Sequence, residues 1–315
     1  MDPVVQVHGL KKAYGKTIAV DDVSFEIDEG EIFGMVGPNG AGKTTTTECI
    51  EGLRIPDQGR LRILGLDPVI QERTLRPLIG TQLQSTNLPN GLKVWEALDL
   101  YASFYPHPVD WSGLIDQLGL DEKRDTPFRK LSGGQKQRLF IALALVNDPR
   151  LVFFDELTTG LDPQARHVIW DLVRGVRQRG KTVFLTTHYM EEAEKLCDRV
   201  AIMDHGKVVA LDTPTNLIRS IVSESRITFT VDDPDDHRAK LQEKLAALDI
   251  VKRVDLNGDQ FTLYGRETGK YGPSRLLIQV VEILASQEIA FRDLHSDQPD
   301  LEDVFLALTG QAIRD

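Results

Sequence analysis

A glycine-rich segment near the N-terminus carries the residue types that bind phosphate. Residues 37–44 read GPNGAGKT, and small residues let backbone N–H groups curl around phosphate oxygens at the start of a helix. Lys43 is expected to contact the β- and γ-phosphates, and the Thr44 hydroxyl is expected to ligate Mg²⁺. A chance match in a chain of this length has odds of roughly one in a hundred. The residues expected to touch the nucleotide are Gly37, Pro38, Asn39, Gly40, Ala41, Gly42, Lys43, Thr44 and Thr45.

Two adjacent carboxylates, Asp155 and Glu156, end an apolar run at residues 151–154. This arrangement suits a metal-side acid next to a water-activating base at the end of a strand. Asp155 is expected to hold Mg²⁺ and Glu156 to polarise the attacking water. Acidic pairs at strand ends are usually only solvated, so the position of this pair downstream of the phosphate loop is what favours hydrolysis.

The segment LSGGQ at residues 131–135 lies between these two features. With it, about the first 220 residues resemble the ATP-binding subunits of ABC transporters. In that family this signature loop closes on the γ-phosphate bound to the opposite subunit, which implies nucleotide contacts for Ser132, Gly133, Gly134 and Gln135. From the sequence alone Ser132 is a helix N-cap, and the two roles are compatible because a capped helix can point its dipole at phosphate.

The resemblance also assigns roles that spacing does not. It implies that Tyr14 stacks on adenine, that His188 is a switch contacting the γ-phosphate, and that Asp162 is an acid at the subunit interface. Gln84 matches the glutamine that touches Mg²⁺ and the attacking water and signals to the membrane partner, with Gln82 as the less favoured choice. Taken singly, each of these residues is more often structural, and it is their joint order that carries weight.

One residue departs from the family pattern. Leu157 follows Glu156 where the family usually shows proline, so a slightly looser loop without loss of hydrolysis is expected.

Alternating apolar runs and helical patterns around these motifs predict a parallel α/β sheet. The expected strands are residues 4–7, 23–27, 32–36, 151–154, 182–187 and 199–203, and the expected helices are 94–104, 111–118, 134–146 and 164–179. The predicted fold class is α/β, a P-loop NTPase core of the ABC ATPase type with an antiparallel β subdomain and an inserted helical subdomain at about 88–149. This ATPase domain is expected to span residues 1–222.

A second domain is predicted at residues 225–312. Its strands and helices follow in the order βαββαβ, from a strand at 227–231 to a strand at 289–294, which predicts a small α+β ferredoxin-like fold.

Composition excludes several classes of protein. The net charge of −11 argues against a nucleic-acid partner, because phosphate-backbone binding needs a basic surface. No apolar run approaches the roughly 20 residues that a membrane-spanning helix needs, so direct membrane insertion is not expected. Cys49 and Cys197 lack metal-type spacing and are expected to be buried thiols in a reducing compartment.

The resemblance implies a function that one chain cannot complete. The expected partners are a second copy or a homologous ATPase subunit, joined by ATP, and a transmembrane permease at the cytoplasmic face of the cell membrane. Residues 300–310 resemble the ending of exporter ATPases of the daunorubicin-resistance type, which favours export of drugs, antibiotics or other hydrophobic compounds. The alternatives are an importer ATPase with a ligand-sensing C-terminal domain, as in methionine uptake, and an ABC protein acting in translation or DNA repair. An RNA-binding role for the second domain is disfavoured by its 17 acids against 11 bases over residues 226–315.

Overall fold

The protein divides into two compact units, described separately here from a computed structural model of the chain. The structure describes residues 3–82, 87–221, 224–231, 235–266, 274–297 and 299–310. One unit takes in Met1–Pro214 and the other Thr215–Ala312. The junction predicted from the sequence lies several residues later, near 222, and stays a prediction.

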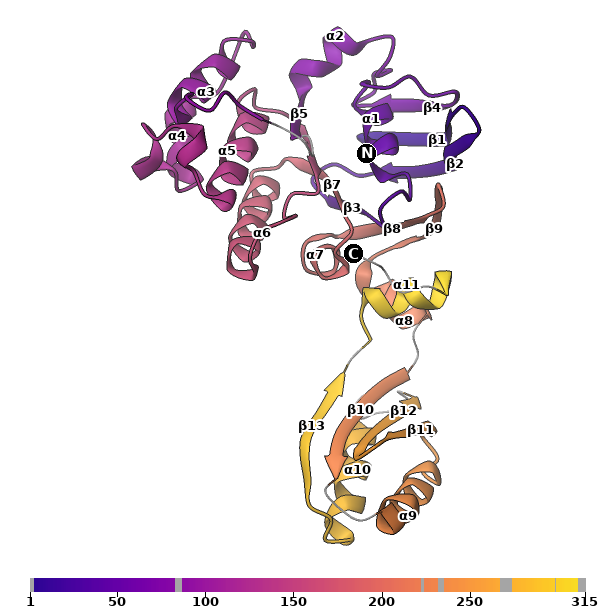
Figure 1. Ribbon diagram of the computed structural model, residues 1–315. Helices are drawn as coiled ribbons and strands as arrows, with labels where there is room; N and C mark the ends of the chain where they lie inside the picture. Colours follow the sequence, from indigo (N-terminus) through magenta and orange to yellow (C-terminus); the bar gives the residue numbers. More distant parts are fainter. Residues whose placement is uncertain are drawn as a thin grey trace. The chain divides into compact units, whose positions relative to one another are not determined.

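A six-stranded sheet forms the centre of the first unit (Figure 1). Its order is β5 (Ile79–Gln82), β6 (Leu151–Asp155), β7 (Thr182–Thr187), β3 (Ile32–Val36), β8 (Arg199–Asp204) and β9 (Lys207–Asp212). All neighbours are parallel except β8 and β9. Every residue of β3, β6 and β7 is buried, as expected for strands covered on both faces. Because β3 and β6 both run parallel to β7, the loops that follow them emerge at one edge of the sheet.

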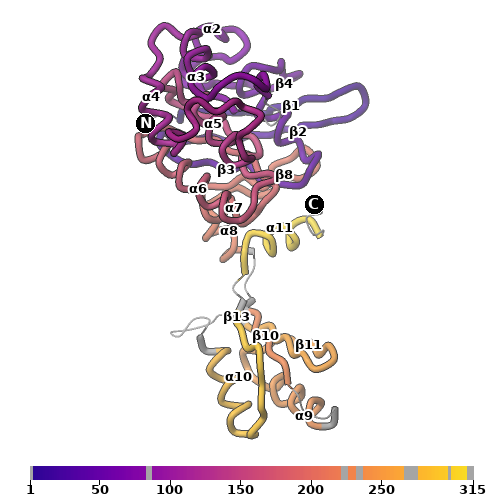
Figure 2. Tube along the Cα trace, turned by 60° about the vertical axis from the view of Figure 1, so that its left-hand side comes forward, coloured from indigo at the N-terminus to yellow at the C-terminus, as the bar shows by residue number. Residues whose placement is uncertain are grey.

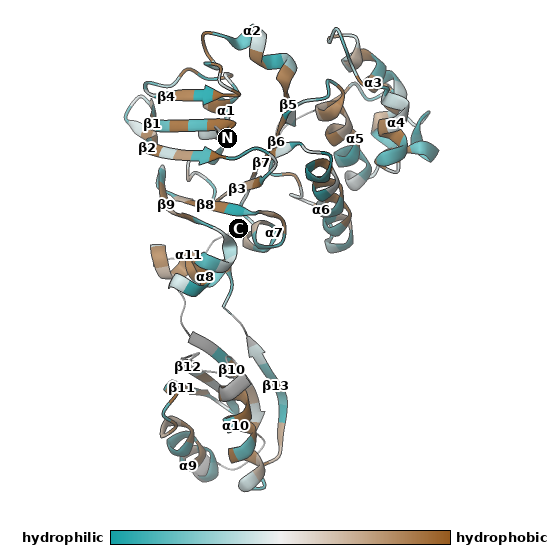
Figure 3. Cartoon of the chain, turned by 180° about the vertical axis from the view of Figure 1, so that it is seen from behind, coloured by the Kyte–Doolittle hydropathy of each residue, from teal (hydrophilic) through white to brown (hydrophobic). Residues whose placement is uncertain are grey.

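A three-stranded antiparallel sheet lies beside it, in the order β2 (Thr17–Ile27), β1 (Val5–Tyr14) and β4 (Gln58–Ile63). Apolar and polar residues alternate along the second half of β2, from Val23 to Ile27, and Figure 3 colours the strand by hydropathy. The buried side chains of this sheet, such as Val7 and Phe25, belong to the same core as Phe33 and Phe184 of the large sheet. The predicted antiparallel subdomain is therefore packed onto the P-loop core.

Helices surround these sheets. α1 (Lys43–Ile50), α2 (Glu72–Leu75), α6 (Pro163–Gln178) and α7 (Met190–Leu196) belong to the core, and single 3₁₀ turns lie at Arg76–Leu78, Asp121–Lys123 and Phe128–Lys130. The predicted helical subdomain consists of α3 (Val94–Ala102), α4 (Trp111–Gln117) and α5 (Gly133–Leu145), which form a cluster of their own in Figure 1. A Cβ on Gly80 of β5 would lie 1.9 Å from the carbonyl oxygen of Ala144, so glycine lets α5 approach the sheet closely.

The second unit begins within α8 (Pro214–Ile221) and contains the predicted βαββαβ order. The elements are β10 (Glu224–Val231), α9 (Asp235–Ala246), β11 (Val251–Asn257), β12 (Gln260–Arg266), α10 (Ser274–Ser286) and β13 (Phe291–Asp297), followed by α11 (Leu301–Thr309). The antiparallel sheet has the order β11-β12-β10-β13, and α10 lies beside β10 in Figure 2. Phe229 and Phe261 on one face of the sheet share a core with Leu241 of α9 and Val280 of α10, which makes this a two-layer fold.

Two smaller observations concern the cysteines and the length of the helices. Cys49 and Cys197 are free and buried, and burial raises the pKa of Cys49 to about 11 and that of Cys197 well above its usual range. Within the described residues, no helix is both long enough and apolar enough to cross a bilayer.

Candidate functional site

The phosphate loop joins β3 to α1, and two of its glycines are required by their surroundings. Gly37 has φ 156°, and a Cβ there would lie 2.1 Å from the carbonyl oxygen of Met203. Gly42 has φ 103°, and a Cβ there would lie 2.3 Å from the carbonyl oxygen of Ala19. Neither position accepts a side chain, so the glycine pattern reflects a tightly enclosed turn.

The first turn of α1 is left open to a ligand. Gly42 is its N-cap, so no side chain caps the helix, and the first turn contains no acid. The free N–H groups and the helix dipole therefore favour an anion at this end. A pocket of about 320 Å³ lies here, lined by Ala19, Asn39, Gly40, Gly42, Lys43, Thr44, Thr45 and Glu156.

Lys43 lies inside the curl of the loop and is 4% exposed. Its Nζ donates to the carbonyl oxygens of Gly37 at 2.7 Å and Pro38 at 3.1 Å. Burial lowers the pKa of the ammonium, against the opposing charges of Glu156 and Asp155. The lysine is thus held at the loop, where it can pair with phosphate oxygens.

Asp155 ends β6 as a buried carboxylate. The hydroxyl of Thr186 on β7 donates a hydrogen bond to Asp155 Oδ1. Burial raises the pKa of Asp155 and the neighbouring charge of Glu156 adds to the rise, while Thr186 and Lys43 lower it. Thr186 therefore both orients one oxygen of the carboxylate and favours its ionised form.

Glu156 and His188, two of the predicted site residues, lie next to each other. His188 Nδ1 lies 3.5 Å from Glu156 Oε1, and their side chains are 11% and 7% exposed. Glu156 has φ 49°, an uncommon conformation for a non-glycine residue, and its N–H donates to the carbonyl oxygen of Thr186 at 3.0 Å. Thr159 Oγ1 donates to Glu156 Oε2 at 3.4 Å. The base candidate is thereby fixed on both sides while still lining the phosphate pocket.

Thr186 and Thr159 were not predicted from the sequence. Thr186 is one of two threonines that end the buried strand β7, and a hydroxyl in a buried strand is a signal of a polar neighbour. Thr159 has no such signal, because its role depends on the turn that follows Glu156.

The signature loop lies away from the phosphate pocket of its own chain. Ser132 is the N-cap of α5: its Oγ accepts from Gln135 N at 3.3 Å, and Gln135 Oε1 accepts from Ser132 N at 3.0 Å. Ser132 and Gly133 are exposed. A Cβ on Gly133 would make ordinary contact with Leu161 at 3.5 Å, and one on Gly134 with Ala165 at the same distance. The residues lining the phosphate pocket include no part of this loop.

Two further predicted residues, Asp162 and Tyr14, do not line the phosphate pocket, and a third, Gln84, is not described. Asp162 is the N-cap of α6, where Ala165 N donates to its side chain at 2.9 Å. Tyr14 is 42% exposed at the end of β1, with the Arg54 guanidinium 5.2 Å from its ring centre, and is not part of the pocket wall. Gln84 lies outside the described residues, and its alternative Gln82 is a buried residue at the end of β5.

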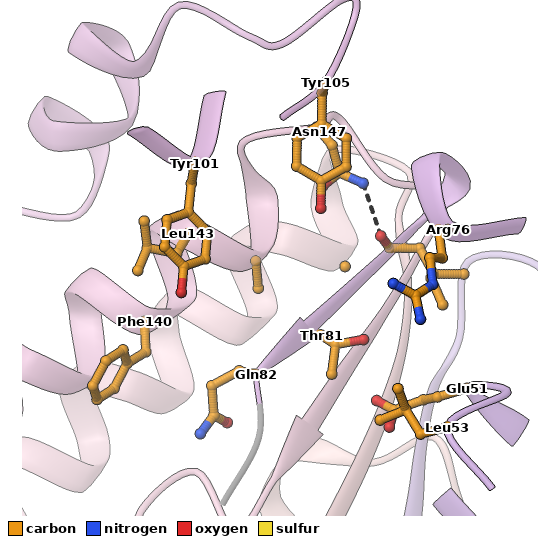
Figure 4. Close-up of a pocket in the computed structure, with 13 residues that line it drawn as sticks. Glu51, Leu53, Arg76, Thr81, Gln82, Tyr101, Tyr105, Phe140, Leu143 and Asn147 are labelled. Carbon is orange, nitrogen blue, oxygen red and sulfur yellow. Dashed lines mark hydrogen bonds between the residues drawn. The ribbon is translucent and has the colours of Figure 1, made fainter. Parts of the chain in front are cut away.

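A second cavity, of about 280 Å³, lies between the end of α1, β5 and the helical subdomain. Figure 4 shows Tyr101 and Tyr105 on one side of it and Glu51 on the other, with Thr81 between them. Burial raises the pKa of the Glu51 carboxyl to about 8, and in the part of the chain that the structure describes its Oε2 has no hydrogen-bond partner.

Comparison with known proteins identifies the family. The profile of the family described as "ABC transporter" matches residues 20–159, a stretch containing the phosphate loop, the signature loop and Asp155–Glu156. The Nod factor export ATP-binding protein I of Ralstonia nicotianae is 38% identical, covering 99% of this chain and 96% of its own. The chain belongs to the ATP-binding subunits of ABC transporters. Another Nod factor export ATP-binding protein I, from Rhizobium sp., is 36% identical, covering 98% and 97% of the two chains.

Solved ABC subunits have the same core. The structure of an ATP-binding subunit of an ABC transporter is 29% identical, with TM-score 0.62, covering 69% of this chain and 92% of its own. A dimeric ATP-binding cassette in a post-hydrolysis state bound to ADP and Pi is 27% identical, with TM-score 0.60, covering 66% and 98%. The protein is thus an ABC ATPase that binds ATP, and the predicted P-loop NTPase fold class is confirmed.

Proposed function

We propose that this ABC subunit powers an exporter by closing, together with a second ATPase subunit, on two ATP molecules. The observation that carries the proposal is the separation of the phosphate pocket from the exposed signature loop within one chain. The second subunit is a copy of this chain or a homologue of it. A phosphate bound at α1 needs a second set of donors on its open side, and the start of α5 from another subunit offers them. Asp162 lies beside this surface as the predicted interface acid.

Within each site, we assign a separate role to each residue. Loop residues 37–45 and Lys43 bind the phosphates, and Tyr14 is the predicted adenine contact at the rim. Glu156 Oε1 accepts the proton of the attacking water, and His188, 3.5 Å away, contacts the γ-phosphate. Gln84 completes the site as the predicted contact to water and the metal.

Mg²⁺ fits the oxygen donors of this site. Thr44 lines the phosphate pocket, and Asp155 has one oxygen fixed by Thr186 and a second left for a metal or its water. Among the described residues no three His, Cys, Asp or Glu side chains form a metal site, so the remaining ligands would come from phosphate and water. When bound, the ion neutralises charge on the phosphates.

The membrane partner is a permease subunit, which we expect to insert into the cavity in Figure 4. β5 forms its floor and ends at Gln82, two residues before Gln84 in the sequence. The C-terminal end of α1 forms a wall, and the N-terminal end of the same helix follows the phosphate loop. A segment seated there would contact both parts of the nucleotide site. Replacing Tyr105 with Ala should weaken capture of the co-expressed permease without changing ATP hydrolysis by the isolated subunit. Unchanged capture would argue against this location.

Export is favoured by the relatives, which are named Nod factor export ATP-binding protein I. This chain matches them over almost their whole length. The resemblance of residues 300–310 to drug exporters of the daunorubicin-resistance type points the same way, and the compound carried would be chosen by the permease. An importer regulated through the second domain is the main alternative. Binding of a small imported molecule to the complete chain, measured by calorimetry, would favour that alternative.

A complementation experiment tests the composite site. Lys43→Ala removes the phosphate contact, and Ser132→Arg blocks the exposed signature loop, so each variant alone should be inactive. Co-expressed, they form mixed dimers with one intact site each, and about a quarter of the normal number of sites should return. A mixture as inactive as its two components would contradict the proposal.

The base assignment is tested separately. Glu156→Gln should retain ATP binding, lose hydrolysis, and accumulate as a dimer in ATP, detected by light scattering. The same substitution combined with Lys43→Ala should stay monomeric. Normal phosphate release by Glu156→Gln would contradict the assignment of Glu156 as base.

A further inference from the structure

A buried carboxyl group lines the cavity of Figure 4 and has one oxygen without a partner. Glu51, at the C-terminal end of α1, is 4% exposed, and within the described part of the chain its Oε2 makes no hydrogen bond. In Figure 4 its carboxyl points from the end of α1 toward β5, into the space that the lining residues enclose. A buried acid without a partner is costly, because burial removes the water that would solvate it. Such a group in a cavity wall indicates a ligand that supplies the missing partner.

The charges around Glu51 favour a positive partner. Burial raises the pKa of this carboxyl to about 8, and the negative charges of Asp155 and Glu48 add to the rise. Arg76 also lines the cavity, but it forms an ion pair with Glu72, four residues earlier in the chain. Among the described residues no lysine, arginine or histidine forms an ion pair with Glu51. A cation that enters the cavity would therefore meet a carboxyl that no cation of this part of the chain already occupies.

The rest of the cavity wall suits a long side chain with a cationic end. The lining includes apolar and aromatic side chains, among them Leu53, Phe140, Leu143, Tyr101 and Tyr105. The aliphatic stem of lysine or arginine packs along apolar surface, and aromatic rings attract its charged end. The volume of about 280 Å³ lies just below the ~300–1,000 Å³ of sites that enclose small molecules. An inserted side chain therefore fits this space better than a separate molecule does.

We propose that Glu51 receives an arginine or lysine side chain from the permease segment that docks in this cavity. The proposal rests on the docking location proposed above and adds the chemistry that recognises the partner. In the open cavity at neutral pH, much of the carboxyl is protonated because its pKa is raised. The incoming cation favours the ionised form, and the proton leaves to solvent. The result is a buried ion pair between the two subunits.

The position of Glu51 connects this ion pair to the nucleotide site. The N–H of Glu51 donates to the carbonyl oxygen of Thr47 at 2.9 Å, so the residue belongs to the last turn of α1. The same helix begins at Lys43, directly after the phosphate loop. The permease would therefore be held by the opposite end of the short helix that follows the phosphate loop.

The first experiment measures capture of the co-expressed permease from detergent-solubilised membranes by the tagged full-length chain. Glu51→Gln keeps the size and the hydrogen-bonding groups of the protonated acid but cannot become negative, so capture should weaken at least ~10-fold. The melting temperature and ATP hydrolysis of the separate subunit should stay unchanged, because Glu51 does not line the phosphate pocket. Glu48→Gln is the matched control and should capture the permease normally, since Glu48 pairs with Arg54 and does not line the cavity.

A charge exchange then identifies the partner side chain. Glu51→Lys should abolish capture, because two cations would meet in the cavity. Replacing the arginines and lysines of the cytoplasmic segments of the permease with glutamate, one at a time, should restore capture at one position. Normal capture by Glu51→Gln, or no restoration of Glu51→Lys at any permease position, would overturn the proposal.

Two further variants keep the outcomes distinct. If Tyr105→Ala weakens capture and Glu51→Gln does not, the docking location stands and only the recognition of a cation is wrong. Unchanged capture in both variants contradicts the location itself. If Glu51→Lys does not fold, Glu51→Asp takes its place: stronger capture by Glu51→Asp than by Glu51→Gln supports the proposal, and equal capture by the two rejects it.

Discussion

The N-termini of α1 and α5, which the proposed function assigns to the two sides of one bound phosphate, differ in how their first turns are capped. α1 starts at Gly42 without a side-chain cap, and its loop is enclosed so tightly that Gly37 and Gly42 accept no Cβ. α5 starts at Ser132 with a complete capping box, and Gly133 has room for a Cβ.

Under the proposed function, this difference in capping assigns each helix to one half of the site. The amides of α1 have no partner of their own, so this end is poised for a nucleotide bound by the same chain. In the first turn of α5, the N–H groups of Ser132 and Gln135 already have hydrogen-bond partners within the turn. The turn is therefore stable while exposed, and in the proposed function it contacts the nucleotide of another subunit. Variants of the two helices should therefore fail differently.

Loss of Lys43 should have the largest effect. Lys43→Ala removes a charge-assisted contact to phosphate worth about 2–5 kcal/mol, so ATP affinity should fall at least ~30-fold and hydrolysis should become undetectable. Titration with a fluorescent ATP analogue measures this, with Ser132→Ala as the matched control that should bind normally. Near-normal ATP affinity in Lys43→Ala would contradict the assignment of α1 as the nucleotide-binding helix.

Alanine at the two helix starts should separate folding from assembly. Gly42→Ala forces a side chain into φ 103° and against the Ala19 carbonyl, so both the melting temperature and ATP binding should fall. Gly133→Ala makes only ordinary contact with Leu161 and should keep both, while hydrolysis falls ~10-fold or more because the second subunit no longer approaches closely. Equal losses of melting temperature in Gly42→Ala and Gly133→Ala would contradict this difference between the two helix starts.

The hydrogen bond from Thr186 to Asp155 should appear in the pH profile. Burial already raises the pKa of Asp155, so the acid limb of hydrolysis should lie above that of an ordinary aspartate. Thr186→Val removes an interaction that lowers this pKa, and the limb should move to higher pH, with a loss of about tenfold at its acid end and little change at alkaline pH. If the acid limb of the pH–rate profile of Thr186→Val moves to lower pH or stays in place, ionised Asp155 is not required for hydrolysis.

The smallest effect is expected at the cap of α5. Ser132→Ala should cost about 1 kcal/mol of folding free energy, as other N-cap substitutions do. Chemical denaturation measures that cost, and ATP affinity of the separate subunit should not change. A loss of affinity would mean that Ser132 serves its own chain.

Local motifs were predictable because the residues that define each motif are consecutive in the sequence. Residues 37–44 and 131–135 each place small residues in a row at the start of a helix, and Asp155 and Glu156 follow directly from a strand. The βαββαβ order of the second unit also followed from hydrophobic periodicity, although strand and helix ends differ by a few residues.

Contacts across the fold were not predictable. Thr186 meets Asp155 only because β6 and β7 pair in parallel, and Glu192 meets Trp170 only because α6 and α7 pack on each other. In the sequence Glu192 is one of several acids in a polar helix, and nothing there distinguishes it from its exposed neighbour Glu191. Burial, which singles it out, exists only after folding.

The two buried thiols have a practical consequence for watching the subunits close. Because burial disfavours the thiolate of both Cys49 and Cys197, maleimide reagents should leave the native protein almost unlabelled. A single cysteine introduced at an exposed position such as Glu191 would then carry the only spin label or fluorophore on each chain. The distance between two such labels would test the proposed approach of two subunits in ATP directly, without a background to subtract.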